Sequence, residues 1–296
     1  MAVLETVRKA SEERHIDFLR WHHHGVSDPD PRPLLERLER YYDAVLRRSA
    51  QVEAVGPFTL FVAAAGGPFY ARPRLGLTTP INGDDVTVVL ARQRTLGVPE
   101  ALEWVCETTP SLADAARSAG LTVAELPLLI LDRPLAVRAP VGFQVRRVMA
   151  NEGDLERILA VAEVAFAHAS SAQGPAGPEE RDVIAATIAT DRSRMRERLA
   201  TGTTVLMVAE DHDGPIASGM HQLVDDVTEV VGVATLPTAR RRGAATAVTA
   251  ALVREALSSG ASLVFLSAAS DAIARIYEKL GFRRIARAGI AEVPRA

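Results

Sequence analysis

The stretch with the clearest chemical potential is "ATLPTARRRGAATAVTAALV", residues 234–253. Arg240, Arg241 and Arg242 precede Gly243, and an apolar stretch without a helix breaker follows. A helix that begins here has three positive charges at the end where its dipole favours negative ones. The same end presents unpaired main-chain N–H groups, which bind phosphate readily. We therefore predict a turn that a diphosphate completes, because it neutralises both the arginines and the amides.

A plainer interpretation stays open on these residues alone. Lys9 and Lys279 are the only lysines, so the chain favours arginine throughout, and the run can be a solvated loop. Known phosphate motifs do not decide the question. The turn lacks the lysine of G-x-x-x-x-G-K-[ST] and the glycines of G-x-G-x-x-G.

The elements around the turn must position it. A strand is predicted at "FQVRRVM" from residue 143, then a helix over 154–169, a flexible loop over 170–178 and helical structure over 179–200. Three closely spaced strands follow, joined by turns that include the hairpin signal Asp213-Gly214, and they predict an antiparallel meander. After the helix that follows Gly243, the chain reads strand ("SLVFLSA"), helix ("DAIARIYEKL") and strand ("RRIARAGIAEV").

This order of elements resembles the GCN5-related N-acetyltransferase (GNAT) family over roughly residues 143–296. The most specific pieces are "VVGVATLPTARRRGAATAVTAAL" and "AIARIYEKLGF". In that family an R/Q-x-x-G-x-G/A turn wraps the pyrophosphate of acyl-CoA, and the strand before it offers main-chain groups to the pantetheine arm. The resemblance implies acetyl-CoA as co-substrate, with the amides of residues 241–246 as diphosphate donors. The coenzyme-binding residues that it implies are Val233, Ala234, Thr235, Arg240, Arg241, Arg242, Gly243, Ala244, Ala245, Thr246, Ser270 and Tyr277.

Two residues fit the chemistry of acyl transfer to an amine. The amine must lose a proton to a base or a water relay, and the leaving thiolate benefits from a proton donor. Glu229 lies fourteen positions before Gly243, where some family members carry a catalytic glutamate. Tyr277 matches the family tyrosine that donates a proton to the coenzyme A sulfur. The resemblance thus implies Glu229 and Tyr277 as catalytic; the alternatives are a solvent-facing or arginine-paired carboxylate and a half-buried aromatic residue.

The chain departs from the family pattern at Ser270, where the family often has asparagine in contact with coenzyme A. Ser270 can instead be a helix N-cap. Gly281 and Phe282 are expected to be a helix C-cap followed by a core aromatic residue.

The first half of the chain echoes the second. "SLADAARSAGL" and "AIARIYEKLGF" both predict helices that run into glycine and an apolar residue, and pairing Gly120 with Gly281 gives an offset of 161. The same offset aligns "LEWVC" with "LVFLS", and a helix predicted over 84–97 with the helix after Gly243. Three correspondences in register predict a duplicated fold. The alternative is an unrelated α+β domain over residues 1–132.

The first copy lacks the residues that could do chemistry. Gly243, Ala245 and Tyr277 correspond to Asn82, Asp84 and Ala116. An acidic helix start satisfies the dipole internally and repels a pyrophosphate. We therefore predict a degenerate, non-catalytic copy that supports the catalytic domain and lines the acceptor groove, and "GVPEALEWVCETTPSL" resembles N-terminal halves of two-domain family members.

The expected fold class is α+β: tandem GNAT-like domains, each a mixed, mostly antiparallel sheet flanked by helices. The boundaries are 1–132 for the degenerate domain, 133–142 for the linker and 143–296 for the catalytic domain. A chain of 296 residues suffices for two ordinary domains.

Composition narrows the partners and the location. A net charge of −3 gives no general attraction to nucleic acid or to an anionic membrane. No apolar run reaches the roughly 18 residues of a membrane span, the N-terminus lacks a signal-peptide core, and Cys106 is the only cysteine. We expect a cytoplasmic monomer or homodimer whose partner is a small-molecule amine, without nucleic acid or membrane.

The histidines give weaker signals. "WHHH" at 21–24 suggests a metal, but adjacent histidines on a helix point in different directions and no partner has ligand spacing, so no metal is predicted. His168 and His221 can lie near the acceptor groove, or be structural.

Taken with the resemblance, the sequence predicts an enzyme that moves an acetyl group from acetyl-CoA to the amine of a small molecule, by direct transfer in a ternary complex. Two alternatives from other classes remain. One is an acyl-CoA-binding regulatory module without turnover, and the other is a nucleic-acid binder that uses the arginines, which the negative net charge disfavours.

Overall fold

The fold is described from a computed structural model of the whole chain. The structure describes residues 30–63, 70–133, 135, 141–168, 172–187 and 192–294. Residues Leu35–Ala296 form one compact unit and Met1–Leu34 form another. The "WHHH" run at 21–24 lies outside the described residues.

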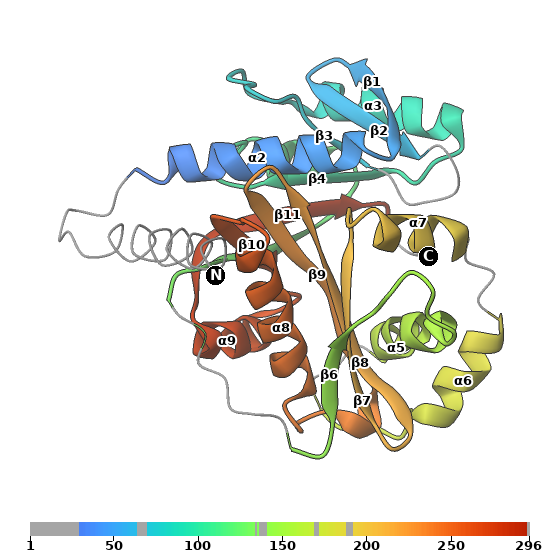
Figure 1. Cartoon of the computed structure of the whole chain (residues 1–296). Coiled ribbons are helices and arrows are strands. Elements are labelled where there is room, and N and C mark those ends of the chain that lie inside the picture. The colour runs from blue at the N-terminus through green and yellow to red at the C-terminus, as the bar shows by residue number, and fades with distance from the viewer. Residues whose placement is uncertain are drawn as a thin grey trace. The chain divides into compact units, whose positions relative to one another are not determined.

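A single sheet runs through the larger unit (Figure 1). Its strands are β1 (Ala50–Val55), β2 (Phe58–Ala63), β3 (Ala71–Pro73), β4 (Ala101–Val105), β5 (Thr122–Leu131), β6 (Gln144–Arg147), β7 (Val205–Asp211), β8 (Gly214–Val224), β9 (Val227–Thr235), β10 (Leu263–Ser267) and β11 (Phe282–Glu292). The spatial order is β1-β2-β3-β4-β11-β5-β10-β9-β8-β7-β6. Only the pairs β3–β4 and β9–β10 are parallel, so the predicted mixed, mostly antiparallel sheet is confirmed.

The described helices flank this sheet. They are α2 (Arg32–Arg47), α3 (Gly83–Leu96), α4 (Leu112–Ser118), α5 (Leu155–Ala167), α6 (Pro178–Thr187), α7 (Arg192–Ala200), α8 (Ala244–Ser258) and α9 (Asp271–Leu280), with the 3-10 turn η1 (Pro237–Ala239). The described residues of the stretch 179–200, which was predicted to be helical, belong to α6 and α7. No described helix is both long and apolar enough to cross a membrane.

The predicted meander of β7, β8 and β9 is confirmed. Residues 205–209 of β7 are all buried, which means that both faces of the strand are covered. Val205, Met207 and Ala209 belong to the core that includes α8. Leu206 and Val208 belong to a second cluster with residues of α5 and α7. The meander is therefore held rigidly at the point where the arginine turn leaves it.

The two halves of the chain exchange their last strands. β5 of the first half lies between β10 and β11 of the second, and β11 in turn lies between β5 and β4. Leu129 and Leu131 of β5 join the core of the second half. Ala291 of β11 joins the core of the first half, beside Trp104. Neither half completes its core without a strand of the other.

The repeat expected at an offset of 161 is present in the fold. Starting from β3, the first half runs β3, α3, β4, α4, β5, and the second half runs β9, α8, β10, α9, β11. Shifting the second set by the predicted offset places each element on its counterpart. β1, which periodicity did not predict, is an edge strand whose residues are exposed or half-buried.

Candidate active site

The arginine-glycine turn joins η1 to α8. Arg240 is extended, Arg241 and Gly243 have left-handed φ values of 66° and 85°, and α8 begins at Ala244. The helix start has no side-chain cap and no acidic residue in its first turn. A Cβ built on Gly243 meets no atom within 4 Å. The first amides of α8 are therefore open to a bulky anion.

Arg240 directs its guanidinium away from α8. Its Nη2 atom donates to the carbonyl oxygens of Ala165 and His168 at 3.1 and 2.8 Å, and Nη1 donates to that of Ala172 at 3.1 Å. These contacts place the cation at the C-terminal end of α5, where the helix dipole favours positive charge. The charge that is unfavourable at the start of α8 is thus favourable at the end of α5.

Arg242 is also held by the protein. It donates to Asp211 Oδ2 at 2.7 Å and to the carbonyl oxygen of Gly142 at 3.3 Å. Arg241 is exposed, and its side chain makes no hydrogen bond or ion pair with the part of the chain that the structure describes. All three arginines were predicted to bind the coenzyme. The side chains of Arg240 and Arg242 instead hold the turn, and that of Arg241 is exposed.

The loop before α6 supports the same turn. The Gly174 amide donates to the Pro237 carbonyl at 3.2 Å, and the Thr238 amide donates to the Ala176 carbonyl at 3.1 Å. A Cβ on Gly177 would come within 2.8 Å of Thr238 Oγ1. The described part of this loop, residues 172–178, is therefore tied to η1, although the sequence predicted flexibility.

β9 and β10 form a fork in the sheet. They pair only through Val227, Thr228 and Glu229 of β9, after which β9 continues alone on that side to Thr235. Its pairing with β8 shifts between Ser218 and Met220, opposite Gly232, which has a φ of 64°. Such a bulge bends a strand and interrupts its pairing. Val233, Ala234 and Thr235 follow the bulge, and the buried Thr235 hydroxyl oxygen has no partner among the described residues.

Glu229 lies at the base of the fork, where it is half-buried and its carboxylate forms no ion pair with the described residues. The Tyr42 hydroxyl donates to Glu229 Oε1 at 3.2 Å. Burial, and next the neighbouring Glu103, raises the pKa of Glu229 to about 8, against the opposing effects of Tyr42 and Arg72. The residue is half-buried, and no ion pair with an arginine is formed by its carboxylate among the described residues, so its role as a base stays a prediction. A carboxylate with this pKa is suited to accept a proton near neutral pH.

Tyr277 of α9 packs edge-on against Phe282, with ring centroids 5.9 Å apart. Burial raises the pKa of Tyr277 to about 12, so the phenol keeps its proton through the neutral range. Thr249 of α8 is the neighbour that opposes this shift. The Ser270 side chain accepts from the Ile273 amide, so it is the N-cap, and Gly281, with a φ of 113°, is the C-cap.

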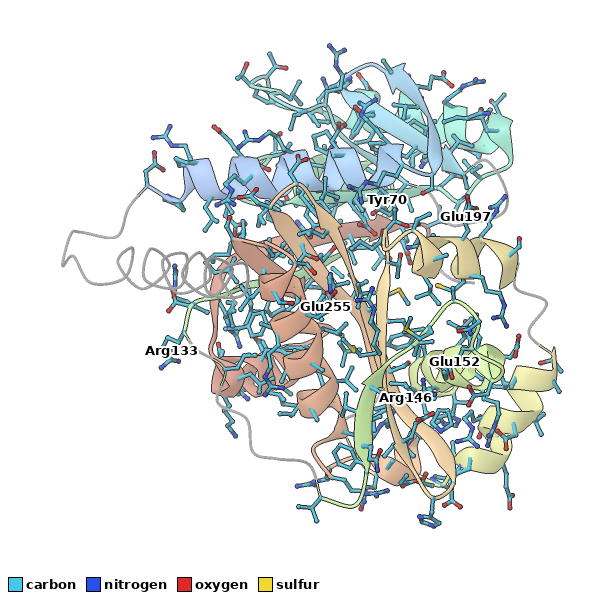
Figure 2. All side chains as sticks on the ribbon, in the orientation of Figure 1. Tyr70, Arg133, Arg146, Glu152, Glu197 and Glu255 are labelled. Atoms are coloured by element: carbon cyan, nitrogen blue, oxygen red, sulfur yellow. The ribbon has the colours of Figure 1, made fainter. Side chains whose placement is uncertain are left out.

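A polar cluster from the first half, which was not predicted, lies next to Glu229. Arg72 of β3 is 4 % exposed and pairs with Glu39 at 3.2 Å and with Glu103 at 3.8 Å. Its guanidinium lies 4.1 Å from the centre of the Tyr42 ring. Tyr70, labelled in Figure 2, favours the ionised form of Glu103 through a hydrogen bond.

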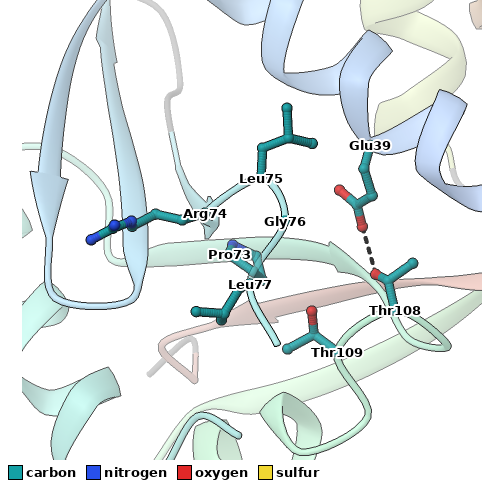
Figure 3. A pocket seen from close by; sticks show the side chains of 8 residues that line it. All are labelled: Glu39, Pro73, Arg74, Leu75, Gly76, Leu77, Thr108 and Thr109. Carbon is teal, nitrogen blue, oxygen red and sulfur yellow. Dashed lines mark hydrogen bonds between the residues drawn. The ribbon is translucent and has the colours of Figure 1, made fainter. Parts of the chain in front are cut away.

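A small pocket adjoins this cluster (Figure 3). Thr108 donates to Glu39 Oε1 at 2.7 Å on one side of it. The lining residues are Glu39, Pro73, Arg74, Leu75, Gly76, Leu77, Thr108 and Thr109. None of these residues was predicted to belong to a site.

The histidines of the second half have structural partners. His221 is buried, and its ring nitrogens lie 3.0 Å from Thr228 Oγ1 and 2.5 Å from Oε2 of Glu255, which is labelled on α8 in Figure 2. His168 ends α5 and pairs with Glu180 at 3.0 Å. Both contacts agree with the structural alternative rather than with an acceptor-binding role.

Among the described residues, one group has metal-ligand proximity: Asp211, His212 and Asp213, whose ligand atoms lie within 4.8 Å of one another. Asp211 already neutralises Arg242. His212 and Asp213 are exposed in the hairpin turn between β7 and β8. Asp211 is thus part of the support of the arginine turn.

The counterpart of the turn in the first half is closed by its own side chains. Asn82 accepts from the Asp85 amide and the Asp85 carboxylate accepts from the Asn82 amide, both at 3.0 Å. This capping box occupies the donors that α8 leaves open. The prediction that the first copy satisfies its helix start internally is confirmed.

Comparisons with known proteins agree with this geometry. Residues 202–284 match the model of the acetyltransferase (GNAT) domain. A GCN5-related N-acetyltransferase from Kribbella flavida superposes with a TM-score of 0.66 at 23 % identity, covering 88 % of this chain and 96 % of its own. A tandem GNAT protein from the clavulanic acid biosynthesis pathway gives 0.53 at 14 % identity, covering 97 % and 96 %. A GCN5-related N-acetyltransferase from Sphaerobacter thermophilus gives 0.52 at 16 % identity, covering 86 % of each chain. No curated protein sequence matches.

The fold is therefore that of GNAT proteins, including a tandem member, over most of the chain. The stretch that matches the acetyltransferase model, residues 202–284, contains the meander, the turn, α8 and α9. This match favours acyl transfer from an acyl-CoA.

Proposed function

We propose that the protein is an N-acetyltransferase that moves an acetyl group from acetyl-CoA to the amine of a small molecule in a ternary complex. The observation that carries the proposal is the uncapped start of α8 behind Gly243, supported from three directions by side chains and loops that are not part of the helix. The first half, whose equivalent start is capped, is the non-catalytic copy in this proposal.

The residues at the fork and the turn fit a coenzyme A thioester. The amides of residues 241–246 would hold its diphosphate, and Arg241 would add a charge-assisted hydrogen bond. Main-chain groups of Val233 to Thr235, which β10 does not pair, would hold the pantetheine arm. Arg240 and Arg242 would act through the shape of the turn, because their side chains are already bound. A Ser270 contact is the weakest part, since that hydroxyl caps α9.

The thioester supplies the acyl group, and the protein supplies proton transfers and alignment. Glu229 accepts the proton of the acceptor ammonium, directly or through a water, so that the neutral amine can attack. The Tyr277 phenol, kept protonated by burial, donates toward the leaving sulfur. Both groups lie on rigid elements, which favours alignment of the two substrates.

The alternative is a module that binds acyl-CoA without turnover, and it predicts no need for a raised Glu229 pKa. A coenzyme A release assay over a panel of small amines separates the two proposals. Release that depends on one class of amine supports the enzyme, whereas binding without release supports the module. The proposed location is the cytoplasm, where acetyl-CoA is available.

The diphosphate site has a direct test in a matched pair of variants. Asparagine and aspartate both tolerate a left-handed conformation and differ mainly in charge. Gly243→Asp should weaken acetyl-CoA binding by roughly 10- to 100-fold through repulsion, while Gly243→Asn should stay within about threefold of wild type. Titration calorimetry measures both. Equal affinities of the two variants would place the diphosphate elsewhere.

A further inference from the structure

Helix α2 of the first half of the chain contacts Glu229 and Phe265 of the second half. The spacing of Leu35, Leu38, Tyr41 and Tyr42 gives this helix one buried face. The Tyr41 and Tyr42 rings both pack edge-on against Phe265 of β10, with centroids 5.1 and 5.4 Å away. β10 is the strand that pairs with Glu229, so α2 is fixed directly over the fork.

The Tyr42 ring is held on several sides. Phe265 and Tyr41 pack against it edge-on, and the buried Arg72 guanidinium lies over its face. These contacts hold the ring with its hydroxyl 3.2 Å from Glu229 Oε1. The bond joins residues that are 187 positions apart in the chain.

Arg72 contacts both Tyr42 and the carboxylate of Glu103. It lies between Tyr42 and Glu103, and it is anchored by Glu39, which Thr108 holds in turn. A hydrogen bond from Tyr42 stabilises the ionised form of Glu229, whereas the Glu103 charge destabilises it. The two influences on the same carboxylate have opposite signs.

We propose that Tyr42 is a positioning residue for Glu229, and that Tyr42, Arg72 and Glu103 together make the first half of the chain a working part of the catalytic site. This inference rests on the proposed role of Glu229 as the base. It assigns to the degenerate half a chemical task, beyond supporting the fold and lining the acceptor groove.

Among the described residues, the titratable groups near Glu229 come from α2, β3 and β4. Tyr41 and Tyr42 come from α2, Tyr70 and Arg72 from β3 and the residue before it, and Glu103 from β4. The partners of Glu229 in the sheet, Gln222 on β8 and Phe265 on β10, carry no charge. A change in the titration of Glu229 can therefore be traced to one of these few residues.

The test is the titration of Glu229 in full-length variants, followed by NMR of 13C-labelled glutamate carboxylates. The signal that Glu229→Gln removes identifies the residue. Tyr42→Phe should raise its pKa by about one unit, because the ionised form loses a donor. Glu103→Gln should lower it by a similar amount, because a like charge is removed. Tyr41→Phe is the matched control: it loses a hydroxyl from the same helix, but one that donates to the Gln222 carbonyl.

Opposite shifts in Tyr42→Phe and Glu103→Gln, with none in Tyr41→Phe, support the inference. Shifts of the same sign, or no shift in Tyr42→Phe, overturn the inference. Glu103→Gln tests only the part assigned to Glu103. The dependence of kcat/KM on pH distinguishes the coupling of Tyr42 to Glu229 from the role of Glu229 as the base. If the Glu229 pKa moves while the profile stays in place, the coupling stands and the base role of Glu229 is wrong.

Discussion

At the scale of single residues, Glu229 leads to a pH dependence of defined sign. Its pKa is raised to about 8, so only about a tenth of the molecules carry the ionised base at pH 7. A base acts when ionised, and kcat/KM should therefore rise with pH and level off above about 8. Glu229→Gln should lower kcat/KM by roughly 100-fold and abolish the rise. A profile that falls through this range would assign the opposite protonation state.

Tyr277 leads to a separate prediction, since it acts on the leaving group. Tyr277→Phe keeps the ring that packs on Phe282 and removes only the hydroxyl. The dissociation constant of acetyl-CoA should stay within about threefold, while kcat should fall by roughly 10- to 100-fold. Calorimetry and steady-state kinetics measure the two quantities. An unchanged kcat would reduce Tyr277 to a core residue.

Glu229 and Tyr277 were predictable as candidates because their spacing from the turn matches the family motif. The residues that surround them in the fold were not predictable. Tyr41 and Tyr42 fall on the apolar face of a periodic helix, so their burial was open to prediction. Their partners Glu229 and Phe265 lie more than 180 residues further along the chain, and no local pattern encodes such a pairing. A buried arginine such as Arg72 requires acidic neighbours, but its burial is itself a tertiary property.

At the scale of elements, the arginines of the turn should separate into two kinds. Arg240 fastens η1 to the end of α5, so Arg240→Gln should lower the free energy of unfolding by about 1–2 kcal/mol. Arg241→Gln should leave stability unchanged, because that side chain is exposed, and weaken acetyl-CoA binding by about tenfold. Urea unfolding and calorimetry on both variants check this. Equal losses of stability would contradict the division.

The meander, α8 and α9 were predictable because hairpin turns and helix periods are local signals. The described residues of the stretch 179–200 are helical, as predicted, because its polar and apolar residues run on without a proline or glycine. β1 was missed because an edge strand with half-exposed residues lacks a clear alternation. The bulge at Gly232 depends on pairing with β8, which single-strand patterns do not contain.

At the scale of the whole molecule, the exchange of β5 and β11 makes each half dependent on the other. The repeat at an offset of 161 was readable, yet the boundary at 133–142, which stays a prediction, separates halves whose strands interleave. Residues 143–296 expressed alone lack Leu129 and Leu131 from their core and should not unfold cooperatively. Co-expression with residues 1–142 should restore a complex with cooperative unfolding, measured by circular dichroism in urea. A stable, acetyl-CoA-binding fragment 143–296 would contradict this dependence.

The central claim is that the open amides behind Gly243 hold the diphosphate of a coenzyme A thioester. A crystal structure of the protein with acetyl-CoA tests it most directly. The account predicts the diphosphate within hydrogen-bonding distance of main-chain N–H groups of residues 241–246, with Arg240 and Arg242 still bound to α5 and Asp211. A diphosphate bound at any other place, or a turn that rearranges to release both arginines, would contradict it.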